Sequence, residues 1–146
     1  MHPSRIATAV ILALAMAACR DGVAEPRAES VALTVTGTET SPDGKMCAFD
    51  VTARNGTGRD AVNIQVAYTA ETTSNGVQSE YIVLGDLAAD EEKTGRLILT
   101  GAPCGDVRTL KLTRAVCTVS PVADPPESCA DAVILDGGGV IEVPAG

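Results

Sequence analysis

The five cysteines are the residues of this 146-residue chain whose chemistry is easiest to specify. Metal and redox sites need thiolates or imidazoles at close spacing, as in a Cys-x-x-Cys pair. The chain contains no such pair, and its only histidine, His2, lies at the N-terminus. We therefore predict no metal site and no cofactor, and the cysteines must have other roles. They are Cys19, Cys47, Cys104, Cys117 and Cys129.

Cys19 follows a segment typical of a secretory leader. Arg5 precedes an apolar run, Ile6 to Ala18, that only Thr8 interrupts. As a helix this run would span about 20 Å, whereas a bilayer core is roughly 30 Å thick. The run is therefore too short to cross a membrane comfortably and has the length of a signal-peptide apolar region. We predict that residues 1–18 are a signal peptide.

The end of this leader, Met16-Ala17-Ala18-Cys19, resembles the lipobox of bacterial lipoproteins, which usually has Leu at the first position. The resemblance implies a diacylglycerol thioether on Cys19, cleavage before it, and acylation of the freed amine, which together anchor stably. Arg20, rather than Asp, follows the cysteine, which in that family favours the outer over the inner membrane. The alternative is an ordinary signal peptide cut after Ala18.

The predicted mature chain is strongly acidic. Of 11 basic and 19 acidic residues, only one basic residue falls in the leader, so the mature net charge is 10 − 19 = −9. Such a chain repels nucleic acid. It also lacks histidine for general-base chemistry, and its acidic run at 90–92 is typical of solvated surface. We therefore expect neither nucleic-acid binding nor enzymatic activity.

Alternation of apolar and polar residues with a period of two runs through most of the chain after a polar tether at 19–29, which indicates half-buried strands. Turn residues separate these strands, as at Asn55-Gly56 and in the triplet Gly137-Gly138-Gly139. Near Arg114 the alternation slips, and a bulge there would return Val116 to the core. The residues predicted to face inward are Val31, Leu33, Val35, Cys47, Phe49, Val51, Ala53, Val62, Ile64, Val66, Tyr68, Leu110 and Leu112.

About seven strands, ending with "DAVILD" and "VIEV", predict a single all-β antiparallel sandwich over residues 30–146. The stretch "FDVTARNGTGRDAVNIQVAY" resembles the second and third strands of immunoglobulin-like and fibronectin type III-like domains of bacterial envelope proteins. The core tryptophan of those families is missing. The resemblance implies the same two-layer architecture here.

Four cysteines remain once Cys19 is assigned to lipid, and they imply two disulfides in an oxidising compartment. If each strand reverses direction, Cys47 lies at the same end of the sandwich as Cys104, and Cys117 at the same end as Cys129. We predict these two pairs. The alternative, Cys47–Cys117, would resemble the bridge between sheets of immunoglobulin domains.

The same topology places two loops, 55–60 and 120–128, at one end of the sandwich. Prolines and the predicted Cys117–Cys129 bridge would preorder the second loop, which lowers the entropic cost of binding. We predict a protein-contact surface there; alternatively, the bridge simply stabilises a long connection. The candidate contact residues are Asn55, Thr57, Arg59, Val122, Pro125 and Pro126.

These features predict a lipid-anchored protein of the cell envelope, facing the periplasm or the cell surface, that binds a protein partner. The alternative function is an acidic inhibitor or immunity protein directed against a cationic enzyme or toxin. A weaker resemblance is to small secreted fibronectin-like proteins that mimic host receptors.

Overall fold

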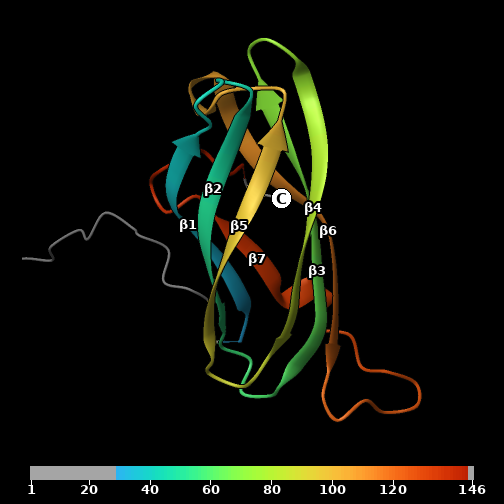
Figure 1. The fold of residues 1–146 in the computed structure, drawn as a ribbon. Helices are drawn as coiled ribbons and strands as arrows, with labels where there is room; N and C mark the ends of the chain where they lie inside the picture. The colour runs from blue at the N-terminus through green and yellow to red at the C-terminus, as the bar shows by residue number, and fades with distance from the viewer. Residues whose placement is uncertain (1–28, 145–146) are drawn as a thin grey trace, which may run out of the picture.

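The computed structural model describes residues 29–144, which contain seven strands and two short 3-10 turns (Figure 1). Their order along the chain is β1 (Val31–Thr40), β2 (Met46–Asn55), β3 (Ala61–Thr72), β4 (Gly76–Leu87), β5 (Glu92–Thr100), η1 (Cys104–Asp106), β6 (Val107–Val119), η2 (Ala130–Ala132) and β7 (Val133–Asp136).

The strands form two sheets, one of four strands in the order β5-β2-β1-β7 and one of three in the order β4-β3-β6. This arrangement confirms the predicted all-β single sandwich. One pairing departs from a fully antiparallel sandwich, because β7 runs parallel to β1, from Val31 opposite Val133 to Thr34 opposite Asp136. The long connection after β6 crosses to the other sheet, so β7 lies beside β1 and not as a strand of the β6 sheet.

The period of two correctly predicted which face of each early strand is buried. In β1 and β2 the alternate apolar residues from Val31 to Val35 and from Cys47 to Ala53 are at most 1% exposed. Phe49 and Tyr68 are among the largest fully buried side chains. Burial of the apolar faces of both sheets is thus the main source of stability in this fold.

Two predicted core positions, Val62 and Val116, are wrong, each because of a backbone irregularity. Asn63 has a positive φ of 55° where the register of β3 shifts, so Val62 turns away from the core and Ala61 is buried instead. The predicted bulge in β6 is present, since the pairing shifts between Leu112 and Arg114. It returns Ala115 and Cys117 to the core, whereas Val116 pairs with Gln65 on the outer face.

The predicted last strand, "VIEV", is not formed. The glycine triplet makes a turn closed by a bond from the Val140 N–H to the Gly137 carbonyl. A Cβ on Gly138, whose φ is +58°, would overlap the carbonyl oxygen of Val35. Beyond the turn, only Glu142 pairs, as an isolated bridge to Thr109.

The sandwich has two distinct ends, and each has its own core cluster. At the end where the chain enters β1, Val31 lies opposite Asn55, and the connections 56–60, 88–91 and 120–128 are found. We call this the entry end. The opposite end, with turns 41–45, 73–75 and 101–106, is the far end. One cluster, around Ile64, packs toward the entry end and the other, around Phe49, toward the far end.

Candidate interaction surfaces

The structure joins the four cysteines in the two predicted pairs. Cys47 bonds to Cys104 at the far end with a Cα–Cα distance of 4.7 Å, and Cys117 bonds to Cys129 at the entry end with 4.9 Å. The immunoglobulin-like alternative, Cys47–Cys117, is therefore wrong. Each bridge ties a loop to the end of a strand, so each end of the sandwich is closed covalently.

The connection 120–128 is the most exposed segment between two strands, and it projects from the entry end, in orange at the lower right of Figure 1. All residues from Pro121 to Ser128 are exposed, including Pro125 and Pro126, and Val122 is 60% exposed. Its base is fixed beside the Cys117–Cys129 bridge, since the N–H of Val119 donates to the Glu127 carbonyl at 2.9 Å. The loop therefore exposes the apolar side chain of Val122, while the hydrogen bond and the disulfide hold the ends of the loop in place.

The two loops predicted to lie together do so. Ser120 donates its N–H to the Asp60 carbonyl at 2.8 Å, and the guanidinium of Arg59 contacts the Glu127 carboxylate at 2.7 Å. Both side chains of this ion pair are about half exposed, at 49% and 58%. Exposed pairs contribute little to stability, typically under about 1 kcal/mol. Their role here is to set the position of one loop against the other.

Asn55 is buried, so its side chain is not part of the exposed contact surface. Its Nδ2 donates to three carbonyl oxygens, those of Arg59, Leu87 and Ala88, at 2.8, 3.0 and 3.1 Å. Its Oδ1 accepts from both the N–H and the hydroxyl of Thr57. Because every polar atom of this amide is satisfied, Asn55 stabilises the entry end from inside. Thr57 is half-buried in the same network.

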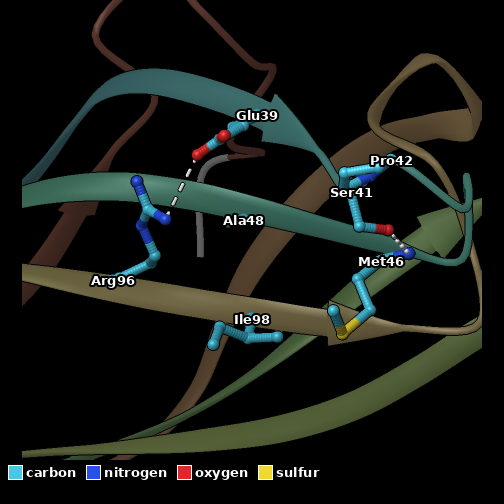
Figure 2. Close-up of a pocket in the computed structure, with 7 residues that line it drawn as sticks. All are labelled: Glu39, Ser41, Pro42, Met46, Ala48, Arg96 and Ile98. Atoms are coloured by element: carbon cyan, nitrogen blue, oxygen red, sulfur yellow. Dashed lines mark hydrogen bonds and ion pairs between the residues drawn. The ribbon is translucent and has the colours of Figure 1, made fainter.

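A hollow of about 220 Å³ lies on the outer face of the four-stranded sheet, toward the far end (Figure 2). Met46 and Ile98, 42% and 46% exposed, supply apolar surface. Arg96 lies at its margin, bonded through Nε to Asp50 at 2.7 Å and through a terminal nitrogen to Glu39 at 3.2 Å. The hydrogen bond and the charge of Asp50, with a further contribution from Glu39, raise the pKa of Arg96.

Because Asp50 and Glu39 both bind the Arg96 guanidinium, this group is not free to bind an anion, and the hollow offers an apolar surface. The residues that line it are Glu39, Ser41, Pro42, Met46, Ala48, Arg96 and Ile98. A second hollow, of about 270 Å³, opens between β6 and β7, where Leu112 and Leu135 face the gap left by the transfer of β7 to the other sheet. Both hollows fit a single partner side chain better than a whole metabolite.

One apolar surface was missed by the sequence analysis. β4 extends over twelve residues, and its outward side chains Val77, Tyr81 and Val83 are 69%, 72% and 58% exposed. Both faces of β4 carry polar and apolar residues, as Glu80 and Ile82 do on the face opposite Tyr81. Alternation alone therefore does not show which face of the strand is exposed.

Within residues 29–144 there is no group of three or more His, Cys, Asp or Glu side chains placed to hold a metal ion. The same residues include no helix that is long and apolar enough to cross a membrane. The predicted leader, Cys19 and the tether up to residue 28 lie outside the described residues.

Comparison with known proteins identifies one similar architecture. The chain resembles IrmA from Escherichia coli, with a TM-score of 0.54 and 12% sequence identity over 73% of this chain and 90% of that chain. No family model matches the chain, and no curated protein matches it. At 12% identity the likeness to IrmA shows the fold alone.

Proposed function

We propose that the chain is a lipid-anchored protein of the cell envelope, without enzymatic activity, that binds a protein partner through its entry end. Acyl chains on Cys19 would hold it to a membrane, with the outer membrane favoured by Arg20. The sandwich would then act as a binding module. The lack of histidine after residue 2 supports a non-enzymatic role, since no imidazole is available for general acid–base chemistry.

The observation that carries this proposal is the position of the exposed loop. The loop 120–128 and the first residues of β1 lie at the same end of the sandwich, since Gly56 donates to the Ser30 carbonyl and Ser120 to the Asp60 carbonyl. The ten residues 20–29 span at most about 33–36 Å when fully extended. A lipid on Cys19 therefore keeps the entry end close to the membrane surface.

This geometry favours a partner that is itself at the membrane. The partner would be a membrane-embedded or lipid-anchored protein whose exposed part reaches the entry end. Its contact surface would accept the apolar side chain of Val122, and its orientation would be set by the loop 55–60. Preordering of the loop base by Cys117–Cys129 lowers the entropy lost on binding.

The anchor is tested by metabolic labelling with palmitate. Wild-type chain should carry the label, processing should stop with globomycin, and Cys19→Ser should lose both the label and membrane attachment. A wild-type chain that is processed but not labelled would exclude the lipoprotein assignment.

The contact role is tested by replacing residues 120–128 with a Gly-Ser segment of equal length. Crosslinking in membranes should then lose the partner band, while peptide mapping still finds the Cys117–Cys129 bridge. Retention of the same partner by a correctly bridged variant would contradict the role of this loop.

A second candidate function is inhibition of a cationic enzyme or toxin. Several carboxylates at the entry end, among them Asp90 and Asp124, form no ion pair with the residues that the structure describes. They would attract a basic partner at long range, with an association rate that falls as salt screens the charges. Salt-sensitive binding to a basic lysozyme, measured by calorimetry, would favour this function over the first.

A further inference from the structure

β4 is an edge strand whose outer side is open. It pairs with β3 on one side, and none of the backbone hydrogen bonds that residues 29–144 form outside their strand pairs involves β4. Side chains donate to β4 carbonyls near its two ends, from Thr72 to Gly76 and from Lys93 and Asn55 to Leu84 and Leu87. The described residues leave the backbone between these points, from residue 77 to 83, uncovered.

The neighbouring strand β5 does not close this edge. It contacts β4 through side chains from across the sandwich, as where the hydroxyl of Thr100 lies 3.3 Å from a Glu80 carboxylate oxygen. The lateral backbone groups of β4 therefore remain accessible to another strand.

The other three sheet edges carry the features that prevent edge pairing, which are charged residues and short length. β5 has Lys93 and Arg96, and β7 has only four residues. β6 has three cations, Arg108, Lys111 and Arg114, and none of them forms an ion pair with another residue of the segment 29–144. Between residues 76 and 85, β4 has no Lys, Arg or Pro and only one charge, Glu80. β4 is thus the one long edge without this protection among the described strands.

We propose that β4 pairs with β4 of a second copy of this chain, antiparallel and around a two-fold axis at Ser79. In this register Tyr81 lies opposite Val77 of the second copy, twice by symmetry, and aromatic–β-branched pairs stabilise antiparallel strands. Glu80 lies opposite Gln78 of the second copy, whose amide can donate to the carboxylate. The two three-stranded sheets then form one continuous sheet of six strands.

Neighbouring registers are less favourable. An axis at Glu80 places two carboxylates opposite each other, which destabilises the pair. An axis at Tyr81 forms one aromatic pair, Tyr81 opposite Tyr81, but it places Val77 opposite Gly85 of the second copy and replaces both aromatic–valine pairs. The apolar residues on either side of Ser79 therefore favour β4 of a second copy as the pairing strand, and they favour the register with its axis at Ser79.

The charge distribution predicts a weak dimer. The described residues carry 8 basic and 17 acidic side chains, a net of −9 that makes two copies repel. The outer face of the pairing sheet is less acidic, because Lys111 and Arg114 lie there with Glu71. One pair of strands buries less than the roughly 800 Å² per partner of a standard interface. Confinement of both copies to a membrane would raise their effective concentration.

The register is tested by cysteine crosslinking of residues 19–146 with Cys19→Ser, exported to an oxidising compartment. All seven strands and both disulfides lie within this segment. Opposed residues of antiparallel strands have Cα atoms about 4.5–5.5 Å apart, which suits a disulfide. Ser79→Cys should form a covalent dimer faster than Thr94→Cys, a matched variant at an exposed position of β5.

A mixture of Val77→Cys and Tyr81→Cys chains should crosslink to each other, whereas neither should crosslink to itself. Crosslinking of Tyr81→Cys to itself would overturn the register, and Ser79→Cys dimerisation no faster than that of Thr94→Cys would overturn the pairing.

Association itself is measured by sedimentation equilibrium. The average mass of the Cys19→Ser chain should rise toward that of a dimer as concentration increases, and more so at higher salt, which screens the net charge. Tyr81→Lys should abolish this rise, whereas Val122→Lys, an equal change at a similarly exposed residue, should not. A Cys19→Ser chain that stays monomeric at all concentrations, or loss of association in both variants, would overturn the proposal.

Discussion

The two ends of the sandwich are both closed by a disulfide, yet their interiors differ in kind. The far-end cluster contains Phe49 and Tyr68, whereas the entry-end cluster contains no aromatic ring. The far-end bridge joins residues 57 apart in sequence and the entry-end bridge residues only 12 apart. At the entry end, the buried amide of Asn55 adds a hydrogen-bond network to a cluster of aliphatic side chains that includes Leu33 and Ile64.

The two ends therefore differ in the interactions that stabilise them and in how far their loops are exposed. Aromatic packing and a long disulfide loop stabilise the far end. The entry end combines an aliphatic cluster with directed hydrogen bonds and a short disulfide loop, and it carries an exposed loop of irregular structure. A long loop is tolerated there because only its base must be fixed.

The largest effect should come from removing the disulfides one at a time. The Cys47→Ser, Cys104→Ser variant should lose ~4 kcal/mol of unfolding free energy, and the Cys117→Ser, Cys129→Ser variant ~3 kcal/mol, because the longer loop gains more entropy when unfolded. Denaturant unfolding measures both. A larger loss of unfolding free energy on removal of the entry-end bridge would contradict the expectation that the far-end bridge contributes more to stability.

A smaller loss should follow removal of the buried amide. Asn55→Ala removes one hydrogen bond from each of the carbonyls of Arg59, Leu87 and Ala88, which should cost about 2–3 kcal/mol. The Arg59 carbonyl keeps the Thr57 hydroxyl as a donor, and the Ala88 carbonyl keeps the Glu91 N–H. The matched control is Asn75→Ala at the far end, where an exposed amide donates only to the Gly101 carbonyl and the loss should stay under about 1 kcal/mol. Equal losses would show that the entry end does not depend on Asn55.

The sequence already contained the signal for this burial. Asn55 continues the alternation that makes Cys47, Phe49, Val51 and Ala53 inward, so its position in the strand predicts a buried side chain. The Asn55-Gly56 pair by itself favours an exposed turn, which is why Asn55 is among the predicted contact residues. Strand periodicity correctly predicted the sandwich, and chain reversal correctly predicted both disulfides, because both depend on local pattern and strand direction.

Features set by contacts distant in sequence could not be predicted in this way. The parallel pairing of β7 with β1 depends on where a long connection crosses between the sheets. The outward position of Val116 depends on which residue of β6 the bulge leaves unpaired. The open edge of β4 follows from the strand order, which the alternation of a single strand does not contain.

Tyr68 makes the far end sensitive to alkaline pH. Its hydroxyl donates to the Ile98 carbonyl at 2.8 Å, and burial raises its pKa to about 12, with a smaller contribution from the charge of Glu80. Because the folded-state pKa is above the unfolded value of about 10, the stabilisation is complete below pH 10 and is lost as pH rises toward 12.

Tyr68→Phe should therefore lower the unfolding free energy by about 1–2 kcal/mol at neutral pH and remove this component of the alkaline loss. Unfolding curves of both chains between pH 9 and 12 measure it. Parallel pH profiles for the two chains would contradict the role of the buried hydroxyl.

The smallest effect should come from the exposed ion pair at the entry end. Arg59→Ala removes the contact with Glu127 and should cost less than about 1 kcal/mol, falling further in high salt. Arg96→Ala at the far end is the matched change, and it should cost more because Arg96 contacts both Asp50 and Glu39. A larger, salt-independent loss for Arg59→Ala would mean that the loop contact contributes to folding.

The most direct test of the account is photo-crosslinking from the entry end in intact membranes. A photoreactive residue at position 122 is compared with one at position 140, another exposed valine, 44% exposed, that lies outside the loop. We expect a specific partner adduct from position 122 and none from position 140. Adducts from position 140 alone, or the same adduct from both positions, would contradict the assignment of the entry end as the contact surface.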